Sequence, residues 1–140
     1  MARIKLHLPE KFLFQCTIPV RITDINYGGH AGNDSVLSII HEARMQFLSS
    51  KNYTEMEVDG VSLIMGDVAI EFKSEIFYGD VLTAFVKATD LAKAGFDLYY
   101  KILNQEGKLI VIAKTGMICF DYNKRKIVAL PETAKEKLTN

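Results

Sequence analysis

The sequence predicts an α+β fold, a curved five-stranded antiparallel sheet wrapped around one long helix and followed by a short C-terminal helix. Three observations lead to it. Apolar residues recur at helical spacing over residues 36–47, after a single strand-like run. Four further strand-like runs then follow in succession, which is the order of an α+β layout. The 140 residues are enough to bury a core, so we expect a single domain over residues 1–140.

The first strand is predicted over residues 12–22, FLFQCTIPVRI, because this run is rich in aromatic and β-branched residues. Pro19 cannot donate a hydrogen bond to a neighbouring strand, so this strand should lie at a sheet edge or carry a bulge. Residues 23–33 contain three glycines, two asparagines and one aspartate, which is typical of a turn.

The long helix is predicted to follow this turn and to end near Ser50. Its buried face is marked by apolar residues three or four positions apart, namely Val36, Ile40, Ala43 and Phe47. Asn33, Asp34 or Ser35 is expected to cap its N-terminus by accepting a bond from a free backbone N–H group.

The remaining strands are predicted from alternation of apolar and polar residues. They cover residues 67–73, 81–88, 96–102 and 109–120, with a hairpin loop at 104–108. The last run is almost continuously apolar, so we expect a central strand buried on both faces. Pro131 and Glu132 then open the short C-terminal helix. One helix covers one face of such a sheet, and the uncovered face and edge favour self-association.

Composition excludes several classes of function. The net charge is zero, and the basic cluster Lys124–Lys126 is short enough to be a solvated turn, so we expect no nucleic-acid partner. No apolar run approaches the length of a membrane span or a signal peptide. Cys16 and Cys119 lie in apolar runs, as reduced cysteines do in cytoplasmic proteins. The histidines and cysteines show no metal-ligand spacing, and we expect no metal and no cofactor.

The turn before the long helix is the candidate site. Gly28, Gly29 and Gly32 leave backbone N–H groups unobstructed beside a helix N-terminus, where they could hold an oxyanion or a phosphate, or simply form a tight connection. His30 could position water or move a proton, or could bond only to loop carbonyl groups. Asp34 could be a helix cap or a general base.

Three further polar residues are candidates beside this turn. Asp24 and Asn26 end the first strand, where such residues often close turns. Glu42, on the helix, could activate water at a partner subunit or lie solvated.

Read together, these residues resemble the hotdog-fold acyl-CoA thioesterases of the 4-hydroxybenzoyl-CoA thioesterase type. That family carries a stretch of the form D-x-D-x-x-G-H-x-N-N-x-x-Y-L followed by E-A-R. The matching positions here are Asp24-Ile25-Asn26, Gly29-His30, Asn33, Leu37 and Glu42-Ala43-Arg44. Further similar segments are Ile70–Lys73, Tyr78-Gly79-Asp80 and Val128–Glu132. The resemblance spans nearly the whole chain and implies a hotdog fold and a thioester-binding site.

One position departs from the family pattern. Asn26 stands where many members have the carboxylate that acts as nucleophile or base, and an amide can do neither. The resemblance therefore implies hydrolysis of an acyl-CoA or acyl-carrier-protein thioester in which Asn26 orients the carbonyl or the water. His30, Asp34 or Glu42 would then supply the base, and a non-hydrolytic acyl-CoA or carrier-binding module is the alternative. A dehydratase or hydratase on the same fold matches this arrangement poorly.

The resemblance also implies how the substrate is held. We expect the thioester carbonyl to rest against backbone N–H groups near Gly28–His30, with Asp24, Tyr27, Gly28 and Gly29 binding the substrate. The acyl chain would enter an apolar channel between helix and sheet at a subunit interface. The chain is accordingly expected to form a homodimer or a dimer of dimers.

Overall fold

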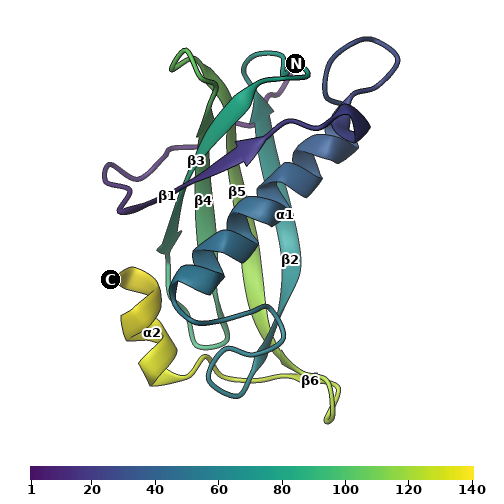
Figure 1. The fold of residues 1–140 in the computed structure, drawn as a ribbon. Helices are drawn as coiled ribbons and strands as arrows, with labels where there is room; N and C mark the ends of the chain where they lie inside the picture. Colours follow the sequence, from purple (N-terminus) through teal and green to yellow (C-terminus); the bar gives the residue numbers. More distant parts are fainter.

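The computed structural model describes residues 1–140 and shows one antiparallel sheet curved around a long helix (Figure 1). The strands are β1 (Phe14–Pro19), β2 (Ser62–Phe72), β3 (Val81–Thr89), β4 (Gly95–Leu103), β5 (Leu109–Asp121) and β6 (Lys126–Ile127). The helices are η1 (Ile22–Asp24), α1 (Asn33–Ser50) and α2 (Glu132–Thr139). The predicted α+β hotdog fold is confirmed, and the sheet gains a short sixth strand that alternation did not predict.

The strands lie in the order β1-β3-β4-β5-β2, with β6 paired to the end of β5. β1 pairs only with β3, which confirms that the strand carrying Pro19 lies at an edge. β2 forms the opposite edge and pairs only with β5. The long segment containing α1 therefore connects the two outermost strands, and the turn before α1 lies at one end of the sheet.

β5 is the central strand predicted by its apolar run. Four consecutive residues, Ile110–Ala113, are buried, which requires cover on both faces of the sheet. From Thr115 onward the burial alternates, as it does along the whole of β4.

α1 lies against the concave face and buries the apolar positions that its spacing predicted (Figure 1). It ends at Ser50 as expected, but its N-cap is Gly32, so the prediction of a capping side chain at Asn33, Asp34 or Ser35 is wrong. Gly32 takes the extended cap conformation one residue earlier, and it has no side chain to accept a bond from the first turn.

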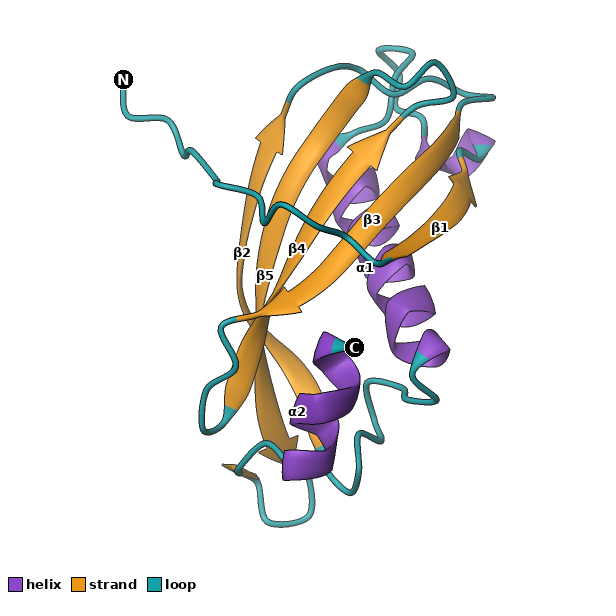
Figure 2. Cartoon of the chain, turned by 90° about the vertical axis from the view of Figure 1, so that its left-hand side faces the viewer, coloured by secondary structure: helices purple, strands orange, loops and turns teal.

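The outer face of the sheet is partly covered by the N-terminal segment, residues 1–13. Figure 2 shows this segment crossing the strands on the side opposite α1. The Leu6 amide donates to Glu71 Oε2 at 2.7 Å, and the Phe12 ring packs edge-on against Phe85 at 6.1 Å. The outer face is therefore partly covered rather than bare, and β1 and β2 are the two unpaired edges of the sheet.

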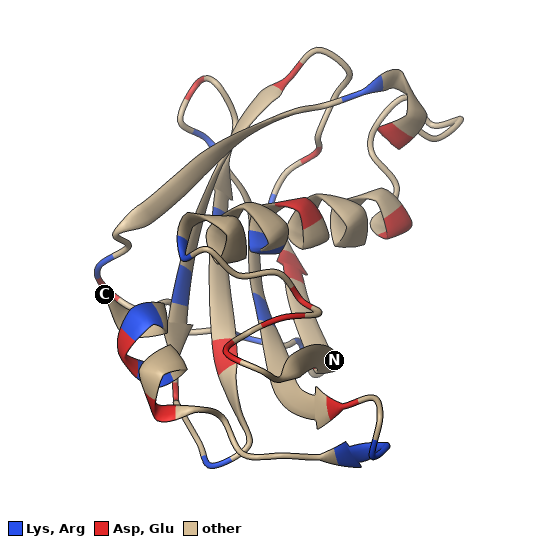
Figure 3. Cartoon of the chain, turned by 60° about the horizontal axis from the view of Figure 1, so that its bottom comes forward, with Lys and Arg blue, Asp and Glu red and all other residues tan.

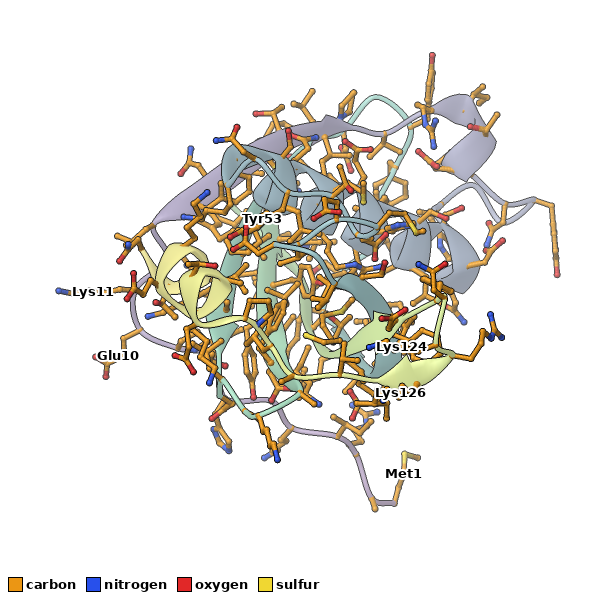
Figure 4. The ribbon with its side chains drawn as sticks, turned by 90° about the horizontal axis from the view of Figure 1, so that it is seen from below. Met1, Glu10, Lys11, Tyr53, Lys124 and Lys126 are labelled. Carbon is orange, nitrogen blue, oxygen red and sulfur yellow. The ribbon has the colours of Figure 1, made fainter.

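α2 closes the lower end of the molecule, where Figure 4 places Tyr53 beside it. The hydroxyl groups of Tyr53 and Thr133 both donate to Asp59 Oδ2 at 2.6 Å, and these two bonds lower the pKa of Asp59. Lys124 lies on the β5–β6 turn and Lys126 begins β6, both well away from Glu10 and Lys11 (Figure 4). No helix of the structure combines the length and the apolar character needed to span a membrane.

Candidate active site

The loop between η1 and α1 is held by its own backbone. Ile25 and Ala31 form an antiparallel bridge, and the Asn26 amide donates to the His30 carbonyl at 3.0 Å. Gly29 has a φ of +86°, a conformation that glycine adopts without strain, and its amide donates to the Asn26 carbonyl at 3.1 Å. The loop is also tied to the segment after β2, because the Ala31 amide donates to the Ile76 carbonyl at 2.8 Å.

The Asn26 side chain is oriented by this loop. Its Oδ1 accepts the Gly28 amide at 2.9 Å, so the Nδ2 group is the free end and has no acceptor in the protein. Asn26 Nδ2 lies on the same side as the Asp34 carboxylate. Both groups are within 3.5 Å of the point where a Gly32 side chain would begin.

The His30 ring is fixed through one nitrogen. Nδ1 lies 3.2 Å from the Ala31 carbonyl, and since a carbonyl only accepts, Nδ1 carries the proton in the neutral ring. Nε2 is then free to accept a hydrogen bond, and it lies 3.9 Å from Glu75 Oε2, an ion pair when the ring is protonated. His30 and Asn26 are close, because Asn26 Oδ1 and His30 Nε2 are 3.2 and 3.6 Å from the point where a Gly28 side chain would begin.

The first turn of α1 supplies the free backbone donors. The helical ladder begins with the Val36 amide bonding to the Gly32 carbonyl, and the cap provides no side-chain acceptor. The amides of Asn33, Asp34 and Ser35 consequently have no protein acceptor. The Gly28 and Gly29 amides, expected to hold a carbonyl, already donate within the loop. The available oxyanion donors are therefore the amides of the first helical turn rather than those of Gly28 and Gly29.

A groove of about 760 Å³ lies beside this loop, and His30 and Asn33 line it whereas Asn26 and Asp34 do not. The lining residues near α1 and the sheet include His30, Val36, Ile76 and Val111, and the far end is formed by the β4–β5 hairpin loop. Charged residues from three segments also line it, among them Lys73, Glu75, Asp80, Glu106 and Lys108. The interior between α1 and the sheet is filled by the hydrophobic core, so the groove enters beside the first turn of the helix.

Other candidate residues lie away from the cluster. Tyr27 is fully exposed, whereas Asp24 is buried and accepts both the Arg21 amide at 2.8 Å and its guanidinium at 3.4 Å. Glu42 accepts a bond from Gln46 at 2.7 Å and shares a second pocket, of about 320 Å³, with Asp24. The two acidic positions of α1 are separated along its length, one at the N-terminal end and one near the middle (Figure 3).

Metal ligands and reactive thiols do not gather at this site. No three His, Cys, Asp or Glu side chains are placed to hold an ion. Burial raises the pKa of Cys119 to about 11, and burial together with the nearby Glu42 charge does the same for Cys16. The polar chemistry of the loop therefore depends on Asn26, His30, Asp34 and the helix amides.

A family model described as the thioesterase-like superfamily matches residues 20–138. The chain belongs to this superfamily. Among the family's curated proteins, the long-chain acyl-CoA thioesterase FadM of Escherichia coli (strain K12) is 25% identical over 126 residues, covering 89% of this chain and 96% of FadM. The resemblance to hotdog-fold thioesterases is thus confirmed, and with it the class of enzyme, a thioester hydrolase.

Two solved structures have the same fold as this chain. Slr0204, a 1,4-dihydroxy-2-naphthoyl-CoA thioesterase from Synechocystis, superposes with a TM-score of 0.80 at 24% identity, covering 89% of this chain and 94% of that one. A DHNA-CoA thioesterase from Staphylococcus aureus gives 0.80 at 20% identity, covering 88% of each chain. At these identities the likeness establishes the fold and does not assign residues.

The groove residues on the segment after β2 were not predicted as part of the site. Glu75 and Ile76 are more than forty positions from His30 and belong to no recognisable motif. The pairing of the Ala31 amide with the Ile76 carbonyl brings them to the loop, where Glu75 also lies 3.9 Å from His30 Nε2.

Proposed function

We propose that this chain is an acyl-CoA thioesterase that hydrolyses a thioester to a free acid and CoA at the N-terminus of α1. The observation that carries the proposal is that Asn26 lies close to both His30 and Asp34, beside three helix amides without acceptors, and that His30 also lines a groove. A carboxylate, an imidazole and fixed N–H donors are the groups that water attack on a carbonyl requires.

Each group has a defined part in this reaction. The carbonyl oxygen is held by the first-turn amides and by Asn26 Nδ2, which stabilise the negative charge that develops on it. His30 Nε2 accepts a hydrogen bond from the attacking water, and Asp34 takes the water proton as the C–O bond forms. The tetrahedral intermediate then collapses, the C–S bond breaks, and the leaving thiolate receives the proton from Asp34.

Asn26 makes this a general-base mechanism. Its amide cannot attack the thioester carbon, so no acyl-enzyme forms at this position. What Asn26 can do is donate, and the bond from the Gly28 amide to Oδ1 turns Nδ2 outward for that purpose. Asp34, rather than a carboxylate at position 26, then supplies the base.

The experiment is a thiol-release assay with long-chain and aromatic acyl-CoA substrates, the classes named for the relatives. Wild-type protein should release CoA, whereas Asp34→Asn and His30→Ala should each lower kcat by about 100-fold or more. Glu42→Gln is the matched carboxylate control and should retain activity, since Glu42 lies in the other pocket. Full activity in Asp34→Asn together with loss in Glu42→Gln would assign the base to Glu42 instead.

A second candidate function is a non-hydrolytic acyl-CoA or acyl-carrier-protein binding module. The observation in its favour is Asn26, at the position where many family members have a carboxylate. Calorimetric binding of acyl-CoA to the wild-type protein, with no release of thiol over hours, would establish this function and refute hydrolysis.

The proposed setting is a cytoplasmic homodimer or dimer of dimers. Both cysteines are free, as expected in a reducing compartment. The open edge at β2 supports self-association, and a partner there would extend the wall of the groove to which Phe72 belongs.

A further inference from the structure

Two glycines of the loop keep space free for the polar cluster. A side chain at Gly28 would begin 3.2 Å from Asn26 Oδ1 and 3.6 Å from His30 Nε2. A side chain at Gly32 would begin 2.8 Å from Asp34 Oδ1 and 3.5 Å from Asn26 Nδ2. By contrast, a side chain at Gly29 would meet nothing within 4 Å.

The backbone does not require glycine at position 32. Its φ of −75° and ψ of 167° are extended values that any residue adopts. A serine at this N-cap position could accept a bond from a first-turn amide through its hydroxyl group, which glycine cannot do. Neither backbone conformation nor helix stability therefore accounts for a residue without a side chain here.

The contact at 2.8 Å is with the end of the Asp34 side chain and not with backbone. A methyl group at position 32 would turn the Asp34 carboxylate away without disturbing the helix. The fold would survive. Only the position of the carboxylate relative to Asn26 and the free amides would change.

We propose that Gly32 is a positioning residue, whose missing side chain lets the Asp34 carboxylate lie beside the Asn26 amide at the N-terminus of α1. This inference rests on the proposed thioesterase activity, with Asp34 as its base. It adds that the glycine at the helix cap sets the position of that base and leaves the first-turn amides uncapped.

A double-mutant cycle tests this coupling, using wild type, Gly32→Ala, Asp34→Ala and the double variant in the acyl-CoA hydrolysis assay. A misplaced base costs about 100-fold in rate, so Gly32→Ala should lower kcat by about that factor and change KM little. The double variant should be no slower than Asp34→Ala alone, because the displaced group is already absent. Ser38→Ala, one turn along the helix, is the control and should keep wild-type kcat.

Gly32→Ser separates positioning from folding. Serine caps the helix, so the melting temperature should be maintained or raised while kcat falls. Wild-type kcat in Gly32→Ala, or losses that add in the double variant, would overturn the role of Gly32 while leaving the thioesterase function intact. A wild-type protein that hydrolyses no acyl-CoA would instead refute the proposed function, and the role of Gly32 with it.

Discussion

Arg44 is a charged side chain held inside the hydrophobic core. It comes from the buried face of α1, where its Nε donates to Glu55 at 3.0 Å and its Nη1 donates to the Tyr100 hydroxyl at 3.3 Å. That hydroxyl is also 2.8 Å from the Thr115 hydroxyl, and no buried side-chain polar atom lacks a partner. The network joins α1, β4 and β5 through groups that would each be costly to leave unpaired.

Replacing Arg44 with alanine should therefore destabilise the protein strongly. The substitution removes the guanidinium bond to Glu55, which keeps only His41 at 2.6 Å, and leaves the Tyr100 hydroxyl without one partner, so we expect a loss of about 3 kcal/mol in the free energy of unfolding. The measurement is urea unfolding followed by circular dichroism. Lys135→Ala removes a pair to the exposed Glu132 and is the control, with an expected change below about 0.5 kcal/mol. Equal effects of the two variants would contradict a structural role for the buried network.

The two cysteines give a prediction about pH. Because burial raises the pKa of Cys119 to about 11 and that of Cys16 to about 11, the thiolate form is favoured only as the pH approaches that value. At pH 8 the thiolate fraction should be about 100-fold lower than for a thiol with a pKa of 9.0. Iodoacetamide should thus label neither cysteine in the folded protein at pH 8 and both in urea, as mass spectrometry can show. Rapid labelling of either cysteine in the folded protein would contradict this.

Gly95 on β4 packs directly against the backbone of β5. A side chain there would begin 2.3 Å from the Met117 carbonyl oxygen, which is backbone and cannot rotate away. Gly95→Ala should therefore force the strands apart and lower the free energy of unfolding by about 3 kcal/mol, measured by urea denaturation. At Gly107 a side chain would meet nothing, and only its φ of +77° opposes substitution, so Gly107→Ala should cost about 1 kcal/mol. A Gly95→Ala protein as stable as Gly107→Ala would show that the strands can separate freely.

The strands differ in how well their patterns predicted them. β5 was predicted closely because a continuous apolar run reflects burial on both faces, and β4 because its alternation is unbroken. β2 begins at Ser62, five residues before the predicted start, because a register shift between Met65 and Asp67 interrupts its alternation. Local periodicity could not reveal this bulge, since its position depends on the pairing with β5.

The candidate site was predictable only in part. The loop and the first turn of α1 are adjacent in sequence, so Asn26, His30 and Asp34 could be grouped from spacing alone. The groove could not be predicted from spacing, because the loop reaches the segment after β2 only through tertiary contacts. The space at Gly32 was equally hidden, since a glycine in a turn usually reflects backbone geometry.

The assembly depends on which surfaces the fold leaves open. The N-terminal segment crosses the outer face of the sheet and α1 covers the inner face, which leaves the edges at β1 and β2, and the β2 edge is the longer (Figure 2). This edge is eleven residues long and carries the exposed apolar side chains Met65, Val68 and Phe72. A long apolar edge strand is a template for pairing with another strand. Two copies related by a twofold axis could pair their β2 edges, so that the free backbone groups of each edge bond to the other.

We accordingly expect the protein to be at least a dimer of the 15.8 kDa chain by light scattering after size-exclusion chromatography. Replacing Met65 and Val68 with lysine would place like charges against each other across the twofold axis, and the mass should fall to that of one chain. Val81→Lys is the matched control, because Val81 is similarly exposed, at 43%, but lies on β3. It should leave the mass unchanged. A monomeric wild-type protein, or a double variant that keeps the wild-type mass, would show that β2 is not the interface.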